Sequence, residues 1–420
     1  MQGRLDIAIV GYGTAGQAAA RLLARQGHCL ELFERAAQPR PVGAGLLLQP
    51  TGLGVLAELG LFEQALACGE AIHELRGETT RGRRVIDMAY AGLDPHWFGL
   101  GIQRGALFQL LRDAAVERGL HSGCEIAAVD ADKGELRDAA GNRYGPYDLI
   151  LVGGGAASAL RDAALTRRDR PYAWGALWCL CADPQGLFRE RLLQRYDGPR
   201  RMAGLLPVGV LPGEDVQQRK IGFFWSLPAQ CLQETVQRGV AAWREEVGDY
   251  WPQLRPVLAS IVDVQQLAPA LYRDAILRRF HRGRVVWLGD AAHAMSPQLG
   301  QGANMALLDA SALARAIASE ATLGAALARY DRERRSHIWI YQFVSRWLTP
   351  LFQSDIGWAG RLRDACLGPL GQAPLLRGEM LKVLAGVKRG LFGRVAVAPL
   401  PPARGTAVQA AAATQPSGAT

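Results

Sequence analysis

The chain opens with two short apolar runs separated by a helical repeat. Asp6 to Val10 is apolar enough for a buried strand, Gln17 to Gln26 carries Ala and Leu at helical spacing, and Cys29 to Phe33 is a second apolar run. The loop between the first run and the helix reads GYGTAG, and Glu34 follows the second run. This order predicts a βαβ unit at the N-terminus.

A GxGxxG loop between a strand and a helix is typical of a dinucleotide site. Gly11 permits the tight turn, Gly13 lets the backbone approach a pyrophosphate, and Gly16 lets the helix pack on the strand. The helix N-terminus offers N–H donors to phosphates, and Glu34 can accept hydrogen bonds from ribose hydroxyls. A helix that needs glycine only for packing would leave Glu34 unexplained, so we expect a bound dinucleotide.

A second loop of small residues, GDAAHAMSPQLGQGAN at 289–304, follows an apolar run and precedes the helical segment Met305 to Ser319. Asp290 can accept a hydrogen bond from a sugar-like hydroxyl, and the backbone N–H groups of 300–304 can face a ring carbonyl or a phosphate. Pro297 can wall the space above a flat ring. The alternative is that Asp290 only caps a short helix.

The middle of the chain has a different texture. Gly175 to Cys181, Met202 to Val210 and Ile221 to Leu227 look like strands bounded by Gly and Pro, which predicts a largely antiparallel sheet. From Met305 onward helical patterns dominate, and the tail from Ala396 to Thr420 lacks apolar periodicity.

Composition and charge narrow the function class. The 420 residues are 49% hydrophobic and 21% charged, which suits a globular protein of two joined domains. The net charge is +9, but Arg is interleaved with acids and we expect no nucleic-acid partner. Seven Cys without CxxC spacing predict reduced thiols and no zinc site. Because Asp6 interrupts any signal-like apolar core and the run 149–160 is too short to span a bilayer, we expect a cytoplasmic location.

Taken together, GxGxxG with Glu34, Arg104 before a helix, and the loop 289–304 closely resemble the class A FAD-dependent aromatic monooxygenases, relatives of the para-hydroxybenzoate, salicylate and ubiquinone-pathway hydroxylases. The resemblance covers roughly residues 5–345. It implies that the first loop holds the ADP half of FAD, that Arg104 contacts the ribityl or pyrophosphate region, and that Asp290 binds the ribityl chain. The loop from Pro297 to Asn304 would lie beside the isoalloxazine.

The fold expected from this resemblance is α/β: a Rossmann-like FAD-binding domain (residues 1–170 and 271–345), an inserted, largely antiparallel β-sheet substrate domain (171–270), C-terminal helices (346–395) and a disordered tail (396–420). The residues expected to bind FAD are Gly11, Gly13, Ala15, Gly16, Glu34, Arg35, Arg104, Asp290, Pro297, Gly300, Gly302, Ala303 and Asn304. Those expected to line the substrate cavity are Leu47, Gln49, Trp178, Phe224 and Trp225, although each taken singly is more often core.

The resemblance also implies the reaction: hydroxylation of an aromatic or polyketide-like small molecule with dioxygen, through a flavin hydroperoxide, with NADPH or NADH as electron donor. The cofactor performs the hard chemistry, while the protein excludes water and positions the substrate. We assign no catalytic side chain and no metal ligand, because no Ser/His/Asp or paired-carboxylate arrangement stands out. His293 is assigned a structural role.

One motif departs from the family. A GADG-like sequence usually precedes Ser-x-x-Arg; here Ser158 and Arg161 are in place, but Gly154 stands where the family has an Asp linked to FAD and NAD(P)H binding. Water or another group can take over that contact. The alternatives are a flavin oxidoreductase of the same fold fed by a separate reductase, and a non-catalytic flavin-binding protein. The Trp174 to Trp178 segment does not match the WxWxIP motif of halogenases.

Two C-terminal segments are basic and apolar together. Residues 332–352 mix Arg with Trp, Tyr and Phe, and residues 377–394 are similar. Packing on the FAD-binding domain with a solvated basic face is the favoured interpretation. Peripheral contact with an anionic membrane is the alternative.

Overall fold

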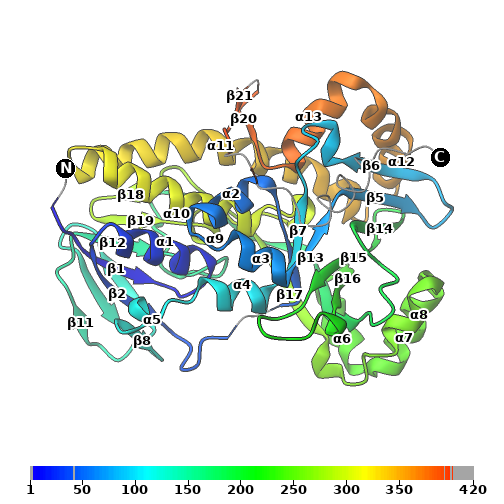
Figure 1. Ribbon diagram of the computed structural model, residues 1–420, viewed down its shortest axis with the longest axis horizontal. Coiled ribbons are helices and arrows are strands. Elements are labelled where there is room, and N and C mark those ends of the chain that lie inside the picture. Colours follow the sequence, from blue (N-terminus) through cyan, green and yellow to red (C-terminus); the bar gives the residue numbers. More distant parts are fainter. Residues whose placement is uncertain (1–2, 41–42, 392, 398–399, 401–420) are drawn as a thin grey trace, which may run out of the picture.

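The computed structural model describes residues 3–40, 43–391, 393–397 and 400 (Figure 1). Most of the tail expected to be disordered, 396–420, lies outside the described residues.

A six-stranded sheet forms the centre of the first layer, in the order β18-β19-β12-β1-β2-β8. The four central strands are parallel, and all four residues of β12 are buried. Helices α1 and α10 contact each other and pack against these apolar strands, as parallel sheets require. The bounds are β1 (Asp6–Val10), α1 (Thr14–Arg25), β2 (Cys29–Glu34), β8 (Leu120–Ser122), β12 (Leu149–Val152), β18 (His281–Arg282), β19 (Val285–Trp287) and α10 (Gly302–Ser319).

A seven-stranded sheet forms the second layer, in the order β17-β13-β16-β15-β14-β5-β6. All neighbours are antiparallel except β14 and β5. One face is covered by α6 (Leu232–Gln237), α7 (Gly239–Tyr250) and α8 (Arg255–Leu258). The strands are β5 (Glu74–Thr79), β6 (Arg84–Ala89), β13 (Thr166–Ala182), β14 (Arg191–Asp197), β15 (Arg201–Gly209), β16 (Lys220–Pro228) and β17 (Ala268–Leu277).

This sheet extends beyond the range 171–270 expected from the sequence. Strands β5 and β6 come from the N-terminal part of the chain, and β5 joins the sheet through its parallel pairing with β14. The sequence of β5 and β6 has the composition of ordinary half-buried strands. Such a sequence does not indicate which distant strand will be the pairing partner, so the pairing of β5 with β14 could not be predicted from it.

Small elements connect the two layers. A three-stranded sheet of β3 (Gly45–Leu48), β7 (Gly99–Gln103) and β4 (Glu70–Ile72) lies between them, with α2 (Pro50–Glu58), α3 (Phe62–Cys68) and α4 (Arg104–Leu111) beside it. The short α5 (Ala114–Glu117) contacts α1 in the first layer. A second three-stranded sheet comprises β9 (Ile126–Asp130), β10 (Glu135–Asp138) and β11 (Arg143–Tyr144).

The C-terminal region is helical, as expected. It comprises α11 (Leu323–Phe352), α12 (Gly357–Gln372), α13 (Pro374–Leu384) and a hairpin of β20 (Lys388–Arg389) and β21 (Gly393–Arg394). Figure 1 shows α11 along one long side of the molecule, with α12 and α13 beside β5 and β6. In the part of the chain that the structure describes, no helix is long and apolar enough to cross a bilayer.

Candidate functional site

The predicted ligand loops meet at one edge of the six-stranded sheet. Parallel pairing of β2, β1, β12 and β19 places the carboxyl ends of all four strands together. Glu34 ends β2, Gly11 follows β1, Gly153 follows β12, and Gly289 lies just beyond β19. Ligands of parallel α/β sheets bind at this edge.

Glycine stands at three positions of the first loop for three different physical reasons. Gly11 has φ +105°, and a Cβ there would lie 2.6 Å from the Gly153 carbonyl oxygen. A Cβ at Gly16 would lie 2.0 Å from the Gly11 oxygen, so α1 can pack closely only with glycine. A Cβ at Gly13 would meet no atom of the described residues within 4 Å. The space beside Gly13, at the N-terminus of α1, therefore fits a pyrophosphate rather than protein packing.

The Glu34 carboxylate is fixed by backbone groups. The N–H of Tyr12 donates to one oxygen at 2.9 Å, and the N–H of Ala36 donates to the other at 2.9 Å. Each oxygen keeps a free lone pair, which suits it to accept from ribose hydroxyls. Arg35, beside it, is exposed.

The second loop begins with a turn at a glycine whose φ is positive. Gly289 has φ +57° and is the N-cap residue of α9 (Asp290–His293), so Asp290 is the first residue inside the helix. The alternative that Asp290 serves as the helix N-cap is therefore wrong. Its carboxylate lies toward the start of α10, since a Cβ at Gly302 would meet Asp290 Oδ1 at 3.8 Å. The arrangement leaves Asp290 available for a polyhydroxylated ligand.

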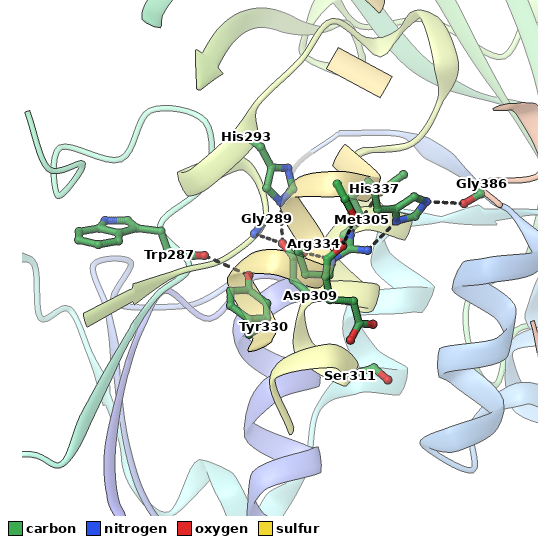
Figure 2. Close-up of polar contacts among 12 residues, drawn as sticks. Trp287, Gly289, His293, Met305, Asp309, Ser311, Tyr330, Arg334, His337 and Gly386 are labelled. Atoms are coloured by element: carbon green, nitrogen blue, oxygen red, sulfur yellow. Dashed lines mark hydrogen bonds and ion pairs between the residues drawn. The ribbon is translucent and has the colours of Figure 1, made fainter. Parts of the chain in front are cut away.

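A buried carboxylate holds this turn. Asp309 on α10 accepts from the Gly289 N–H at 2.7 Å and from His293 Nε2 at 2.6 Å, and its other oxygen accepts from Arg334 Nε at 2.6 Å (Figure 2). Burial alone raises the pKa of Asp309, but His293 and Arg334 outweigh it and bring the pKa to about 2. Asp309 thus stays ionised, and His293, bound to it, has the structural position expected.

The network continues to the C-terminal segment. Arg334 Nη1 donates to His337 Nδ1 at 2.6 Å, and His337 Nε2 donates to the Gly386 carbonyl at 2.8 Å (Figure 2). An arginine can only donate and a carbonyl can only accept, so His337 is the neutral Nε2–H tautomer. Burial and the adjacent Arg334 lower the pKa of His337 to about 3.

Arg161 joins the loop after β12 to the second loop. Its guanidinium donates to the carbonyls of Ala156 at 2.6 Å, Asp290 at 2.8 Å and Ala291 at 2.9 Å. Gly154 is exposed, and a Cβ there would lie 3.1 Å from Ser158 Oγ. An Asp side chain could therefore be accommodated at this position if Ser158 shifts slightly.

The loop around Pro297 is tied to α11. Ser296 Oγ lies 3.0 Å from Ser345 Oγ and 2.8 Å from Thr349 Oγ1. The adjacent Gln298 donates to Gln353 at 2.8 Å, and Gln353 donates to Ser226 on β16 at 2.7 Å. These bonds connect the loop to the substrate-domain sheet.

Among the other residues predicted to bind FAD, some leave their backbone open to a ligand, whereas the Asn304 side chain is already hydrogen-bonded within the protein. Gly300 has φ +61°, and no described residue lies within 4 Å of a Cβ added there. Gly302 and Ala303 form the first turn of α10, where backbone N–H groups are free of helix partners. Asn304 is fully buried; its side chain accepts from the Gln49 N–H at 2.8 Å and donates to the Leu47 and Gly300 carbonyls, both at 3.1 Å. Its side chain therefore shapes the loop, and only its backbone can face a ligand.

Arg104 and Ala15 flank the open space. Arg104 is exposed at the start of α4, and its side chain runs along Gly43, whose added Cβ would lie 3.1 Å from Arg104 Cδ. Among the described residues Arg104 makes no ion pair, so its charge is available for a phosphate. Ala15 lies against Gly289, at 3.4 Å from an added Cβ, and brings the two loops together.

Of the expected substrate residues, the three on the seven-stranded sheet fall on its two faces. Trp178 and Phe224 are direct partners in the β13–β16 register, with ring centroids 5.1 Å apart. Trp225 points to the opposite face, where it packs on Tyr250 at 4.9 Å under α7. Successive strand residues alternate faces, so Phe224 and Trp225 cannot line one cavity. Trp225 is core.

Tyr272 extends the aromatic face of Trp178 and Phe224. Trp178 Nε1 donates to the Tyr272 hydroxyl at 3.0 Å, which leaves the hydroxyl proton free to donate elsewhere. Burial raises the pKa of Tyr272 to about 12, so the phenol remains neutral. On the side of β3, Leu47 packs in a separate apolar cluster. Gln49 accepts from Tyr90 at 2.6 Å, and its amide nitrogen has no partner among the described residues.

Several residues of the site were missed by the sequence analysis. Asp309, Arg334, His337 and Gln17 are buried polar side chains on helices, and neither amide atom of Gln17 has a partner among the described residues. The sequence feature that could have pointed to them is a polar residue at an otherwise apolar position of a helical repeat, as for Asp309 in MALLDASALA at 305–314. Tyr272 carried no signal beyond an ordinary strand position.

Comparisons with known proteins show the family of the chain. The FAD-binding domain family matches residues 4–144 and 151–342. The 3-amino-4-hydroxybenzoate 2-monooxygenase of Streptomyces cremeus is 31% identical over 74% of this chain and 77% of its own length. A probable 2-heptyl-3-hydroxy-4(1H)-quinolone synthase of Rhodococcus erythropolis is 29% identical over 79% of this chain and 84% of its own.

Solved structures show the same fold. Klebsiella pneumoniae HpxO complexed with FAD and uric acid has a TM-score of 0.76 at 20% identity, covering 92% of this chain and 98% of that one. Pseudomonas aeruginosa PqsL in complex with 2-aminobenzoylacetate has a TM-score of 0.69 at 25% identity, covering 85% and 99%. With the paired glycine loops, the fixed Glu34 and the free Asp290, these findings make the chain a member of the FAD-binding family of class A aromatic monooxygenases.

Proposed function

We propose that the substrate is a neutral, largely apolar heteroaromatic compound of the 4(1H)-quinolone kind, hydroxylated on its ring. The observation that carries this proposal is the aromatic face of Trp178, Phe224 and Tyr272, whose polar atoms are two neutral N–H and O–H groups. A second support is the relative in Rhodococcus erythropolis named for a heptylquinolone and another in Pseudomonas aeruginosa, 26% identical over 82% of this chain. Apolar pockets with few polar groups suit such ligands.

We propose roles for the chain's own residues in holding FAD. Glu34 accepts from the ribose hydroxyls, and the open backbone at Gly13 and the Arg104 charge receive the pyrophosphate. Asp290 accepts from the ribityl chain, and the first N–H groups of α10 face the ring carbonyl. Bound FAD supplies dioxygen activation. The protein's part is to hold the aromatic substrate near the ring, exclude water, and let the Tyr272 hydroxyl donate to a substrate carbonyl.

The substrate is tested by anaerobic reduction of the yellow holoprotein with NADPH and NADH. We expect 2-heptyl-4(1H)-quinolone to accelerate flavin reduction and to gain one oxygen atom under air. Para-hydroxybenzoate, an anionic phenol of the same reaction class, is the matched comparison. If only the carboxylated phenol is turned over, the proposed substrate class is wrong.

Gly154 favours a second candidate, in which a separate reductase delivers the electrons. Glycine cannot make the side-chain contact that the family's Asp makes at this position. If neither nicotinamide bleaches the flavin while dithionite does, direct reduction is absent and the second candidate holds. If either nicotinamide reduces it rapidly, Gly154 is a tolerated variation.

We further propose that the protein works in the cytoplasm. All seven cysteines are free thiols in the structure, and reduced thiols are typical of that compartment. Cell fractionation, with the flavoprotein's absorbance followed in each fraction, tests this location.

A further inference from the structure

The exposed apolar side chains gather in the C-terminal region. Of the fourteen large hydrophobic residues exposed in the described chain, ten lie between residues 339 and 391. Patches of this kind mark interaction surfaces in proteins, whereas single exposed apolar residues do not.

The centre of this region is a row of aromatic residues on α11. Trp339, Phe343 and Trp347 follow one another at intervals of four residues, so they share one helix face. Their ring centroids are 5.6 and 6.1 Å apart, and the side chains are 50%, 44% and 69% exposed. Ile356 and Trp358 continue the exposed apolar residues past the end of α11 into α12. We call Trp339, Phe343 and Trp347 the aromatic strip.

The opposite face of α11 already does the structural work of the helix. Tyr341 is buried, while Ser345 and Thr349 bond to Ser296 beside the second FAD loop. The fold therefore does not need the aromatic strip for packing. The expected packing of this segment on the FAD-binding domain describes only one face of α11.

Positive charge accompanies the strip. Residues 332–394 hold eleven Lys and Arg against four Asp and Glu, which is +7 of the chain's net +9. Five of these arginines are exposed and form no ion pair with the described residues: Arg332, Arg361, Arg377, Arg389 and Arg394. A second copy of the chain would bring a second set of these positive charges to the same place, which opposes self-association through this surface.

We propose that the aromatic strip and its arginines dock the enzyme on an anionic lipid bilayer. Trp is favoured at the membrane interface, because its ring is apolar and its N–H is polar. An amphipathic helix that lies in the interface plane buries its apolar face by roughly 5–10 Å, and nearby arginines bind lipid phosphates. With no helix among the described residues able to span a bilayer, this contact is peripheral.

The proposal is independent of the substrate, and it is tested with vesicles. The full-length holoprotein is mixed with phosphatidylcholine vesicles, with or without phosphatidylglycerol, and the bound fraction is measured by flotation. We expect binding only to the anionic vesicles, and weaker binding as salt rises, because screening reduces the charge attraction.

Two variants with matched controls separate the contributions. Trp339→Ser with Phe343→Ser and Trp347→Ser should lower the partition coefficient at least about tenfold. Arg332→Gln with Arg361→Gln should lower it on anionic vesicles. Leu187→Ser with Val262→Ser changes two residues that are 49% and 70% exposed elsewhere, and should bind like the wild type. Unchanged FAD absorbance in each variant shows that the fold is intact.

Three results would overturn the proposal. One is wild-type protein that does not bind anionic vesicles. Another is a triple variant that binds like the wild type. The third is a wild-type dimer in analytical ultracentrifugation that the triple substitution converts to a monomer without any change in vesicle binding; the strip would then belong to a second copy.

Discussion

Asp309→Asn tests whether the buried network holds the second FAD loop. Asp309 is fully buried and accepts three hydrogen bonds of 2.6–2.7 Å, from Gly289, His293 and Arg334. Asparagine keeps the shape but removes the charge and turns one acceptor into a donor. Either Arg334 or the Gly289–His293 pair must then face a donor instead of an acceptor.

The magnitude follows from burial. Removing one partner of a buried ion pair costs about 3–5 kcal/mol, since Arg334 stays buried with its charge uncompensated. The depression of the Asp309 pKa from 3.8 to about 2 corresponds to about 2 kcal/mol of stability at neutral pH. We expect the free energy of unfolding of the apoprotein to fall by about 3 kcal/mol. We also expect FAD affinity to fall about tenfold or more, because the Gly289 turn loses its anchor.

Asp331→Asn is the matched control. Asp331 is a buried helix carboxylate that accepts from the Phe280 N–H at 2.8 Å and pairs with Arg335, but it does not touch the FAD loops. Urea unfolding of both apoproteins and FAD titration by fluorescence quenching give the two quantities. If Asp309→Asn binds FAD within twofold of wild type, with a stability loss no larger than that of Asp331→Asn, the anchoring role is refuted.

Four further predictions concern the loops around the FAD site and the loss of stability at acid pH. Gly13→Ala should leave the apoprotein as stable as the wild type but weaken FAD binding at least about tenfold, whereas Gly11→Ala should destabilise the fold itself. Thermal unfolding with and without FAD distinguishes the two variants. Equal effects of the two substitutions would refute the open space at Gly13. Glu34→Ala should lower FAD affinity by about 1–3 kcal/mol in the same titration with little change in apoprotein stability, and an unchanged Kd would remove Glu34 from the site. Gly154→Asp should fold normally and raise the rate of flavin reduction by NADPH or NADH in stopped-flow measurements; a slower rate would show that the glycine is itself adapted to the donor. The free energy of unfolding should fall as pH drops from 6.5 toward 3, because His337 takes up a proton in the unfolded chain but stays neutral when buried in the folded protein. Asp309 adds to this loss of stability below pH 3.8. His337→Gln should flatten the decline above pH 4, and an unchanged slope would contradict the neutral buried state of His337.

The sequence by itself determined the local units. The βαβ unit was predictable because its apolar runs, its glycines and Glu34 lie close together in the chain, so each element carries its own periodicity. The strand Asp6–Val10 has the bounds that the apolar run predicted. The loop 289–304 was recognisable for the same reason, and so was the antiparallel texture around β16.

Only the tertiary structure decided what these units share. Parallel pairing of four strands brings Gly11, Glu34, Gly153 and Gly289 to one edge, although they are up to 278 residues apart in the chain. Pairing of β5 with β14 extended the second sheet beyond its predicted range, and strand alternation separated Trp225 from Phe224. The role of Asp309 depends on charges from α11 that pack around it, and the exposure of Trp339, Phe343 and Trp347 depends on which face of α11 the FAD-binding domain covers. A one-dimensional pattern shows that a helix has an apolar face, but burial is a property of the surrounding atoms, which only the folded chain supplies.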